Sequence, residues 1–175
     1  MTRAFDLGSL GGLRISAGPS AIAGSALLWV MLGVAARLLG VSLGAAILGG
    51  LIAVLLHWGS EIVHHLGHAR AARATGHPMT GIRLWWLLGM SLYPRDEGPL
   101  PAAVHIRRAL GGPAASGLLT LVAALIAVAV RPLGGATWWV ALFFFLDNLL
   151  VFTLGAFVPL GFTDGSTLLR WWGQR

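Results

Sequence analysis

Long apolar runs separated by short polar breaks dominate the chain. Four of them are long enough for a membrane-spanning helix, which takes roughly 20 residues. Tryptophan pairs lie at or beyond the ends of these runs, where indole rings favour the membrane interface. The pattern therefore predicts an all-α membrane protein with about four transmembrane helices, at residues 20–40, 41–72, 109–130 and 136–160.

The segment between the second and third runs is polar and rich in proline. Within it, residues 81–93 (GIRLWWLLGMSLY) are apolar but too short and too broken by glycine to span a membrane. We predict a short β-hairpin or a re-entrant segment there, with its backbone groups buried in protein rather than lipid. Residues 11–18 (GGLRISAG) are predicted to form a short strand beside it. Because no repeat or linker is visible, we expect residues 1–175 to form a single membrane domain.

The composition supports a membrane protein. Apolar residues make up 57% of the chain and charged residues 10%, whereas soluble domains carry about 25% charged residues. The absence of cysteine excludes disulfides and thiol chemistry. The net charge of +6 comes from arginines, which flank the predicted helices, so we expect a lipid bilayer as partner and no nucleic acid.

The arginines also predict an orientation. In a four-span topology only Arg37 and Arg131 fall on one side of the membrane, and the other arginines fall on the opposite side. Positively charged loops face the cytoplasm. We therefore predict an integral protein of a prokaryotic cytoplasmic membrane, with both termini and the central loop in the cytoplasm. The arginines on that side are Arg3, Arg14, Arg70, Arg73, Arg83, Arg95, Arg107, Arg108, Arg170 and Arg175.

The second run carries a stripe of ionisable residues, namely His57, Glu61, His64, His65 and His68. At about 100° per residue, the five share an arc of roughly 100° on one helix face. Such residues are costly inside a membrane and by default mark a function. His64 and His68 are one turn apart, so their imidazoles can converge on one metal ion. The alternative is a hydrogen-bonded stripe of neutral imidazoles, with Glu61 paired to one of them.

A metal site needs a third ligand, and the chain has six acidic residues. Asp6, Asp96 and Glu97 lie in the N-terminal tail and the polar loop, where solvated charges are ordinary. Asp164 follows the fourth run, which crosses the membrane in the same direction as the second, so its depth matches that of the histidine pair. Asp147 would lie about 20 Å or more away along a continuous helix. Asp164 is therefore the natural third ligand.

Three motifs together resemble the site-2 proteases, a family of intramembrane zinc metallopeptidases. Residues 64–69 (HHLGHA) resemble the family's His-Glu-Leu-Gly-His-Ala helix, and residues 156–165 (AFVPLGFTDG) its distal Asn-x-x-Pro…Leu-Asp-Gly motif. Residues 108–119 (RALGGPAASGLL) resemble its Ala-Gly-Pro helix start. The resemblance covers residues 11–170. It implies zinc bound by His64, His68 and Asp164, and membrane-embedded helices as substrates.

The chain departs from the family pattern where the chemistry occurs. His65 replaces the glutamate of the signature and Ala156 replaces the asparagine, while Thr163 and Ser166 are minor changes. In zinc hydrolases a carboxylate beside the metal serves as general base. Either His65 or Glu61 is a candidate for that catalytic role. Glu61 is equally able to orient a neighbouring histidine by a hydrogen bond, the commoner use of a carboxylate near a metal site.

Three functions follow from these readings. The first is a zinc-binding, site-2-protease-like membrane protein with weakened or lost peptidase activity, which binds transmembrane helices of other proteins or regulates them. The second is an active intramembrane metallopeptidase that uses His65 or Glu61 as base. The third is a histidine-rich di-iron oxidoreductase, for which His77 and His105 would have to add ligands.

Overall fold

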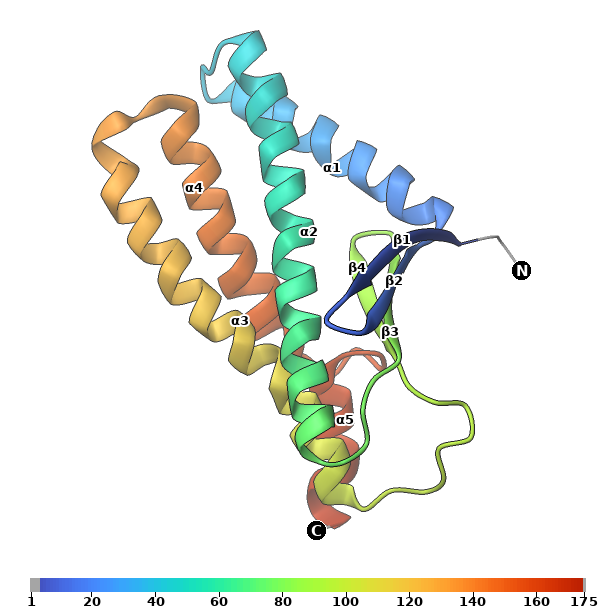
Figure 1. The fold of residues 1–175 in the computed structure, drawn as a ribbon. Helices are drawn as coiled ribbons and strands as arrows, with labels where there is room; N and C mark the ends of the chain where they lie inside the picture. The colour runs from blue at the N-terminus through green and yellow to red at the C-terminus, as the bar shows by residue number, and fades with distance from the viewer. Residues whose placement is uncertain (1–3, 175) are drawn as a thin grey trace.

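A computed structural model of the protein describes residues 4–174, which form a helical bundle with a small sheet along one side (Figure 1). Within these residues, four helical segments are long and apolar enough to cross a membrane. This confirms the predicted fold class. The segments are α1 (Pro19–Leu38), α2 (Leu43–Ala74), α3 (Ala102–Val130) with the 3-10 turn that follows it (Arg131–Leu133), and α4 (Gly135–Asp147) with its irregular continuation to Phe157.

Helix α2 is the central element of the bundle and packs against α1, α3 and α4 (Figure 1). It approaches α3 most closely where two glycines face each other. A Cβ added to Gly111 would lie 2.5 Å from the carbonyl oxygen of Gly67 and 2.7 Å from the Cβ of Ala71. Small residues that let backbones touch are a usual basis for helix association in membranes. Here the glycines place α3 in direct contact with the turns of α2 that carry the histidines.

The fourth apolar run is not one continuous α-helix. It becomes a π-helix at Asn148–Leu154 and a 3-10 turn at Gly155–Phe157. Residues 158–163 are non-helical, and a short helix, α5 (Asp164–Trp171), follows. π-helical turns are rare and often occur at functional sites. The change of helix type lets the chain leave the bundle and turn back, so that α5 packs on α3.

The sheet has the strand order β1-β2-β3-β4. The predicted hairpin is present as β3 (Gly81–Trp85) and β4 (Leu88–Leu92), and the predicted neighbouring strand is β2 (Leu13–Ala17), parallel to β3. Strand β1 (Phe5–Leu10), antiparallel to β2, was not predicted. The inner face of the sheet packs on the last turns of α2, in a core that includes Leu13, Ile82 and Ala72.

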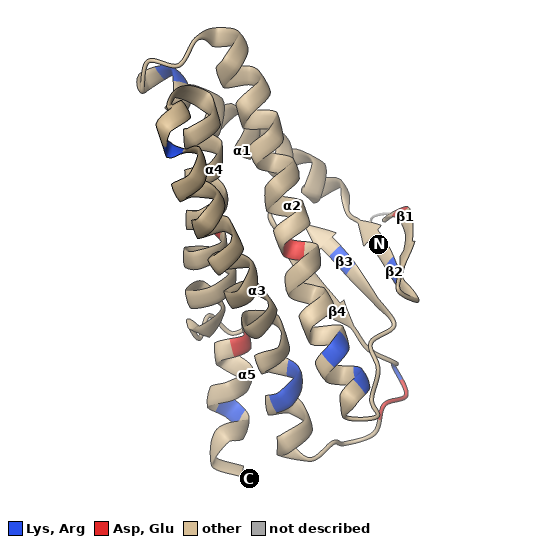
Figure 2. Ribbon diagram, turned by 60° about the vertical axis from the view of Figure 1, so that its left-hand side comes forward, with Lys and Arg blue, Asp and Glu red and all other residues tan. Residues whose placement is uncertain are grey.

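Arginines lie at both ends of the bundle and on strands β2 and β3 (Figure 2). Arg37 ends α1 and Arg131 follows α3, at the end that holds the two inter-helix turns. Arg70 and Arg73, near the end of α2, belong to the opposite end, which we call the basic end. Arg3 and Arg175 lie outside the described residues. The cytoplasmic orientation of the basic end stays a prediction.

Candidate metal centre

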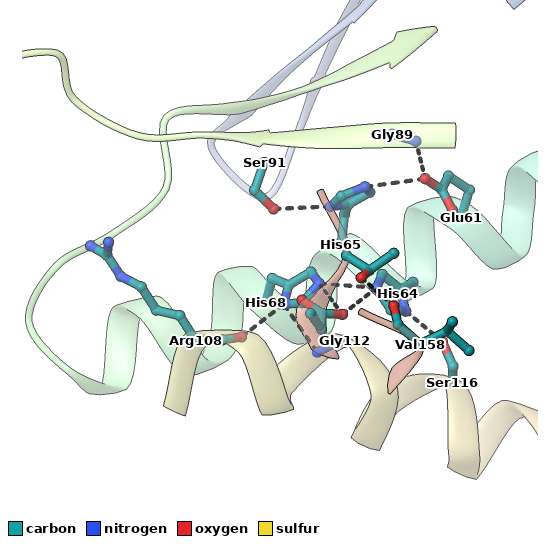
Figure 3. A network of polar contacts seen from close by, with 12 residues as sticks. Glu61, His64, His65, His68, Gly89, Ser91, Arg108, Gly112, Ser116 and Val158 are labelled. Atoms are coloured by element: carbon teal, nitrogen blue, oxygen red, sulfur yellow. Dashed lines mark hydrogen bonds and ion pairs between the residues drawn. The ribbon is translucent and has the colours of Figure 1, made fainter. Parts of the chain in front are cut away.

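The structure brings His64 and His68 (Figure 3) together with Asp164, although the aspartate is distant in sequence. The Nε2 atoms of the two imidazoles are 3.0 Å apart. Asp164 Oδ2 lies 3.3 Å from His64 Nε2 and 3.4 Å from His68 Nε2. Both histidines are buried and the aspartate is partly buried. Within residues 4–174, this is the group of three such side chains whose ligand atoms could hold a metal ion.

The three distances fit a small tetrahedral cation. Zinc–ligand bonds of about 2.0–2.1 Å place neighbouring ligand atoms of a tetrahedron about 3.3 Å apart, and the observed separations are 3.0, 3.3 and 3.4 Å. Two imidazole nitrogens and one carboxylate oxygen are a donor set that zinc accepts, with a fourth position left open.

Helix α3 orients both imidazoles. His68 Nδ1 lies 2.7 Å from the carbonyl oxygen of Arg108 and 3.2 Å from the amide nitrogen of Gly112. The shorter contact is to an oxygen that can only accept, so it favours the tautomer with the proton on Nδ1, in which Nε2 presents a lone pair to the cluster. His64 Nδ1 lies 2.9 Å from the hydroxyl of Ser116, which is fully buried. Hydrogen bonds of this kind fix the tautomer and direction of metal-binding histidines. The sequence did not single out Ser116 or the Arg108 carbonyl for this role.

Asp164 reaches the cluster because the chain turns tightly just before it. Thr163 Oγ1 donates to the carbonyl of Val158 at 2.5 Å, and Ser166 Oγ accepts the amide of Gly161 at 2.7 Å. Asp164 is the first residue of α5, where the helix dipole favours a carboxylate.

His65, at the position of the signature glutamate, points toward the sheet rather than into the cluster (Figure 3). Its Nδ1 lies 3.0 Å from Ser91 Oγ on β4, and its Nε2 lies 3.2 Å from Glu61 Oε1. The same Glu61 oxygen accepts the backbone amide of Gly89. Both ring nitrogens of His65 and one carboxylate oxygen of Glu61 therefore already have partners.

These contacts form a regular ladder between α2 and β4. His57 Nε2 donates to the carbonyl of Leu87 at 2.8 Å, Glu61 accepts from Gly89, and His65 meets Ser91. Steps of four helical residues rise about 6.0 Å, and steps of two strand residues rise about 6.6 Å. The two spacings match closely enough for three successive contacts. The stripe on α2 thus divides into two sets: a pair of candidate metal ligands, His64 and His68, and a ladder of contacts that holds the hairpin.

The ladder continues to α4 through a buried pair that the sequence did not predict. His57 Nδ1 lies 3.2 and 3.1 Å from the two carboxylate oxygens of Asp147, and both side chains are only 5% exposed. The adjacent Asn148 donates to Ser60 Oγ at 2.9 Å. Asp147 is therefore a partner of His57 and does not belong to the metal cluster. Its separation from Asp164 cannot be counted in helical steps, because the intervening chain is not a continuous α-helix.

A cavity of about 600 Å³ opens beside the cluster, between the hairpin, the π-helical segment and the start of α5. His64, His68 and Asp164 line it, and so do Glu61 and His65. Ala156, at the place of the family's asparagine, is also part of the wall and contributes no polar side-chain group.

The central loop closes the basic end of this cavity. Arg108 pairs with both oxygens of Glu97 at 2.9 and 2.5 Å, and its guanidinium lies 4.0 Å from the ring centre of Tyr93. The Arg108 hydrogen bonds hold the pKa of Glu97 below its ordinary value. His105 stacks on Trp171 with ring centres 4.2 Å apart, so it does not join the metal cluster.

Comparison with known proteins agrees with this geometry at the level of the fold. No protein-family model matches the sequence, and no curated protein matches it either. A solved structure, described as the site-2 protease from Methanocaldococcus jannaschii, superposes with a TM-score of 0.65. The fold is that of a site-2 protease. The similarity extends over 96% of this chain and 70% of the other at 17% sequence identity. The cluster of His64, His68 and Asp164 thus lies in a membrane protein with a protease-like fold.

Proposed function

We propose that this protein is a zinc-binding, site-2-protease-like membrane protein whose peptidase activity is lost or greatly weakened. His64, His68 and Asp164 would hold the ion. The ligand-atom separations and the hydrogen bonds from α3 support this assignment. When bound, zinc would supply Lewis-acid polarisation of an oxygen at the open position.

The observation that carries the loss of activity is the position of His65. A general base must reach the proton that it removes, at about 2.6–3.2 Å or through one water. Instead, the two ring nitrogens of His65 contact Ser91 and Glu61, and Glu61 accepts the amide of Gly89. Either group would have to break the ladder to act as a base. We infer that the ladder residues position the hairpin, and that the cavity binds transmembrane segments of other proteins without cutting them.

A second candidate is an active peptidase with His65 or Glu61 as base. It is favoured by one observation: Glu61 and His65 line the same cavity as the candidate ligands. The di-iron oxidoreductase has less support, because it needs ligands for a second ion. Among the described residues one group of side chains, His64, His68 and Asp164, could hold a metal ion, and His105 is stacked on Trp171.

Two measurements test the proposal. Metal analysis of purified protein should give one zinc per chain, lost in His64→Ala and Asp164→Asn and kept in His77→Ala, which changes a histidine outside the cluster. A wild type that binds no zinc would refute the metal assignment.

The second measurement is cleavage of a synthetic transmembrane helix in vesicles. Wild type should leave the helix intact, whereas Glu61→Gln combined with His65→Glu should cut it, because that pair restores the signature glutamate without placing two carboxylates in contact. Cleavage by wild type that His65→Ala or Glu61→Gln abolishes would establish the active peptidase instead. The gain of cleavage in the double variant shows that the helix is an adequate substrate.

A further inference from the structure

A second cavity, of about 520 Å³, lies on the opposite side of α2 from the metal cluster. At about 100° per residue, Leu66, Arg70 and Arg73 are on the face away from His64 and His68. The turn of the β1–β2 hairpin forms the other wall. The lining residues are Gly11, Leu13, Leu66, Ala69, Arg70, Arg73 and Ala74.

The charge in this cavity is positive and uncompensated. Arg70 and Arg73 are exposed, and none of the lining residues is acidic. Arg73 donates to the carbonyl of Gly11 at 3.3 Å, and this leaves its other N–H groups free for a ligand. Within residues 4–174, Arg70 has no polar partner. Two guanidinium groups three residues apart are a site for a phosphate, which they bind through paired N–H donors.

The depth of the cavity matches the lipid headgroup layer. Helix α2 has 32 residues and is therefore about 48 Å long, which exceeds the hydrocarbon thickness of about 30 Å. Counted from Leu43 with a tilt of about 20–30°, the hydrocarbon ends near residues 64–66. Leu66 then lies at that boundary, and the backbone of Arg70 lies about 5–9 Å beyond it, within reach of headgroup phosphates.

Strand β1 adds an apolar surface that no part of the described protein covers. Phe5 pairs with Ala17 and Leu10 with Leu13, so each lies on the same sheet face as a buried residue of β2. Yet Phe5 is 50% exposed and Leu10 44%. The sheet extends past α2 at this edge. Acyl chains would cover these side chains if the hairpin rests on the membrane.

We propose that this cavity binds an anionic phospholipid, with the phosphate on Arg70 and Arg73 and the acyl chains along Leu66 and the overhanging side chains of β1. A headgroup with an ammonium ion would bring a third positive charge toward two guanidinium groups. The site therefore favours phosphatidylglycerol over phosphatidylcholine. The proposal is independent of the metal site on the other face of the helix.

The test compares two double variants of the full chain by native mass spectrometry after detergent exchange, with phosphatidylglycerol or phosphatidylcholine added. Arg70→Gln with Arg73→Gln removes the proposed ligands. Arg95→Gln with Arg107→Gln removes the same charge from exposed positions at the same end. Neutralising two arginines near a membrane surface should weaken phosphatidylglycerol binding about 10- to 30-fold, and the control should change it less than threefold.

Three results would overturn the proposal. Equal losses in the two double variants would mean that only net charge acts. Equal binding of phosphatidylcholine by wild type would mean that the apolar surface alone holds lipid. Competition by millimolar inorganic phosphate would reveal a site for free anions. Thermal melting of each variant in detergent verifies that it is folded, so a loss of binding cannot come from misfolding.

Discussion

Gly112 on α3 offers the sharpest test of the metal centre, because its missing side chain leaves room for the imidazoles. A Cβ at this position would lie 2.5 Å from His64 Nε2 and closer still to His68 Nε2, where ordinary contact begins at 3.4 Å. The His64 ring would have to retreat by about 0.9 Å, the difference between these two distances, and the His68 ring by more. Metal–ligand distances tolerate only about ±0.2 Å. Gly112→Ala should therefore remove zinc binding, with affinity falling at least about 100-fold.

The assay is zinc titration of the purified protein, read by competition with a chelating dye and by the rise in melting temperature on adding zinc. Gly117→Ala, five residues further along α3, is the matched control, since the nearest atom to its added Cβ is 3.9 Å away. In both Gly112→Ala and Gly117→Ala, the higher helix propensity of alanine stabilises α3 by roughly 0.5–1 kcal/mol. Gly117→Ala should thus bind zinc normally and melt at or above the wild-type temperature.

The comparison separates the metal site from general packing. Gly111→Ala would press on Gly67 and Ala71 rather than on the imidazoles, so it should lower the melting temperature with or without zinc. Gly112→Ala should abolish the zinc-dependent part of the melting temperature. A folded Gly112→Ala protein that binds zinc as tightly as wild type would refute the conclusion that these two rings form the site.

Three further predictions address the surroundings of the cluster. Ser116→Ala should weaken zinc binding about 10- to 100-fold, because His64 loses its orienting hydrogen bond; the same titration measures it, and wild-type affinity would contradict it. Asp147→Ala should destabilise the fold by about 3 kcal/mol through the unpaired buried His57, with zinc content per folded chain unchanged. The pairing with Arg108 lowers the pKa of Glu97 in the folded protein. The pair therefore stabilises the protein fully at pH values above the ordinary pKa of 4.5, and this stabilisation is lost as the pH falls through the lowered pKa. Melting temperature should therefore fall more steeply with acid in wild type than in Glu97→Gln, and parallel curves would contradict this.

The sequence was most informative where a pattern has a fixed geometry. Helical spacing placed His64 and His68 on one face, and the shared direction of two spans brought Asp164 to them in depth. It failed where the backbone departs from a regular element. The predicted helix of residues 136–160 is α-helical only as far as Asp147, and π-helical, 3-10 and non-helical segments follow one another after it. No hydrophobic periodicity predicts that succession.

Strand β1 shows a different limit. Its sequence, FDLGSL, contains Gly8 with φ of 98°, and the register shifts between Asp6 and Gly8. A bulge of this kind breaks the alternation by which strands are recognised. In addition, all six side chains are exposed, so neither face gives a buried pattern.

The altered residue of the signature is best understood from what a buried imidazole requires. His65 is buried, so both of its nitrogens need partners, because an unmet polar group away from water is costly. β4 supplies one partner through Ser91, and α2 supplies the other through Glu61, whose charge is in turn stabilised by the Gly89 amide. The three contacts depend on one another, so His65 is a structural element of the hairpin attachment. The same face of α2 therefore carries two sets of side chains. His64 and His68 direct lone pairs at a shared point, whereas His57, Glu61 and His65 attach the hairpin.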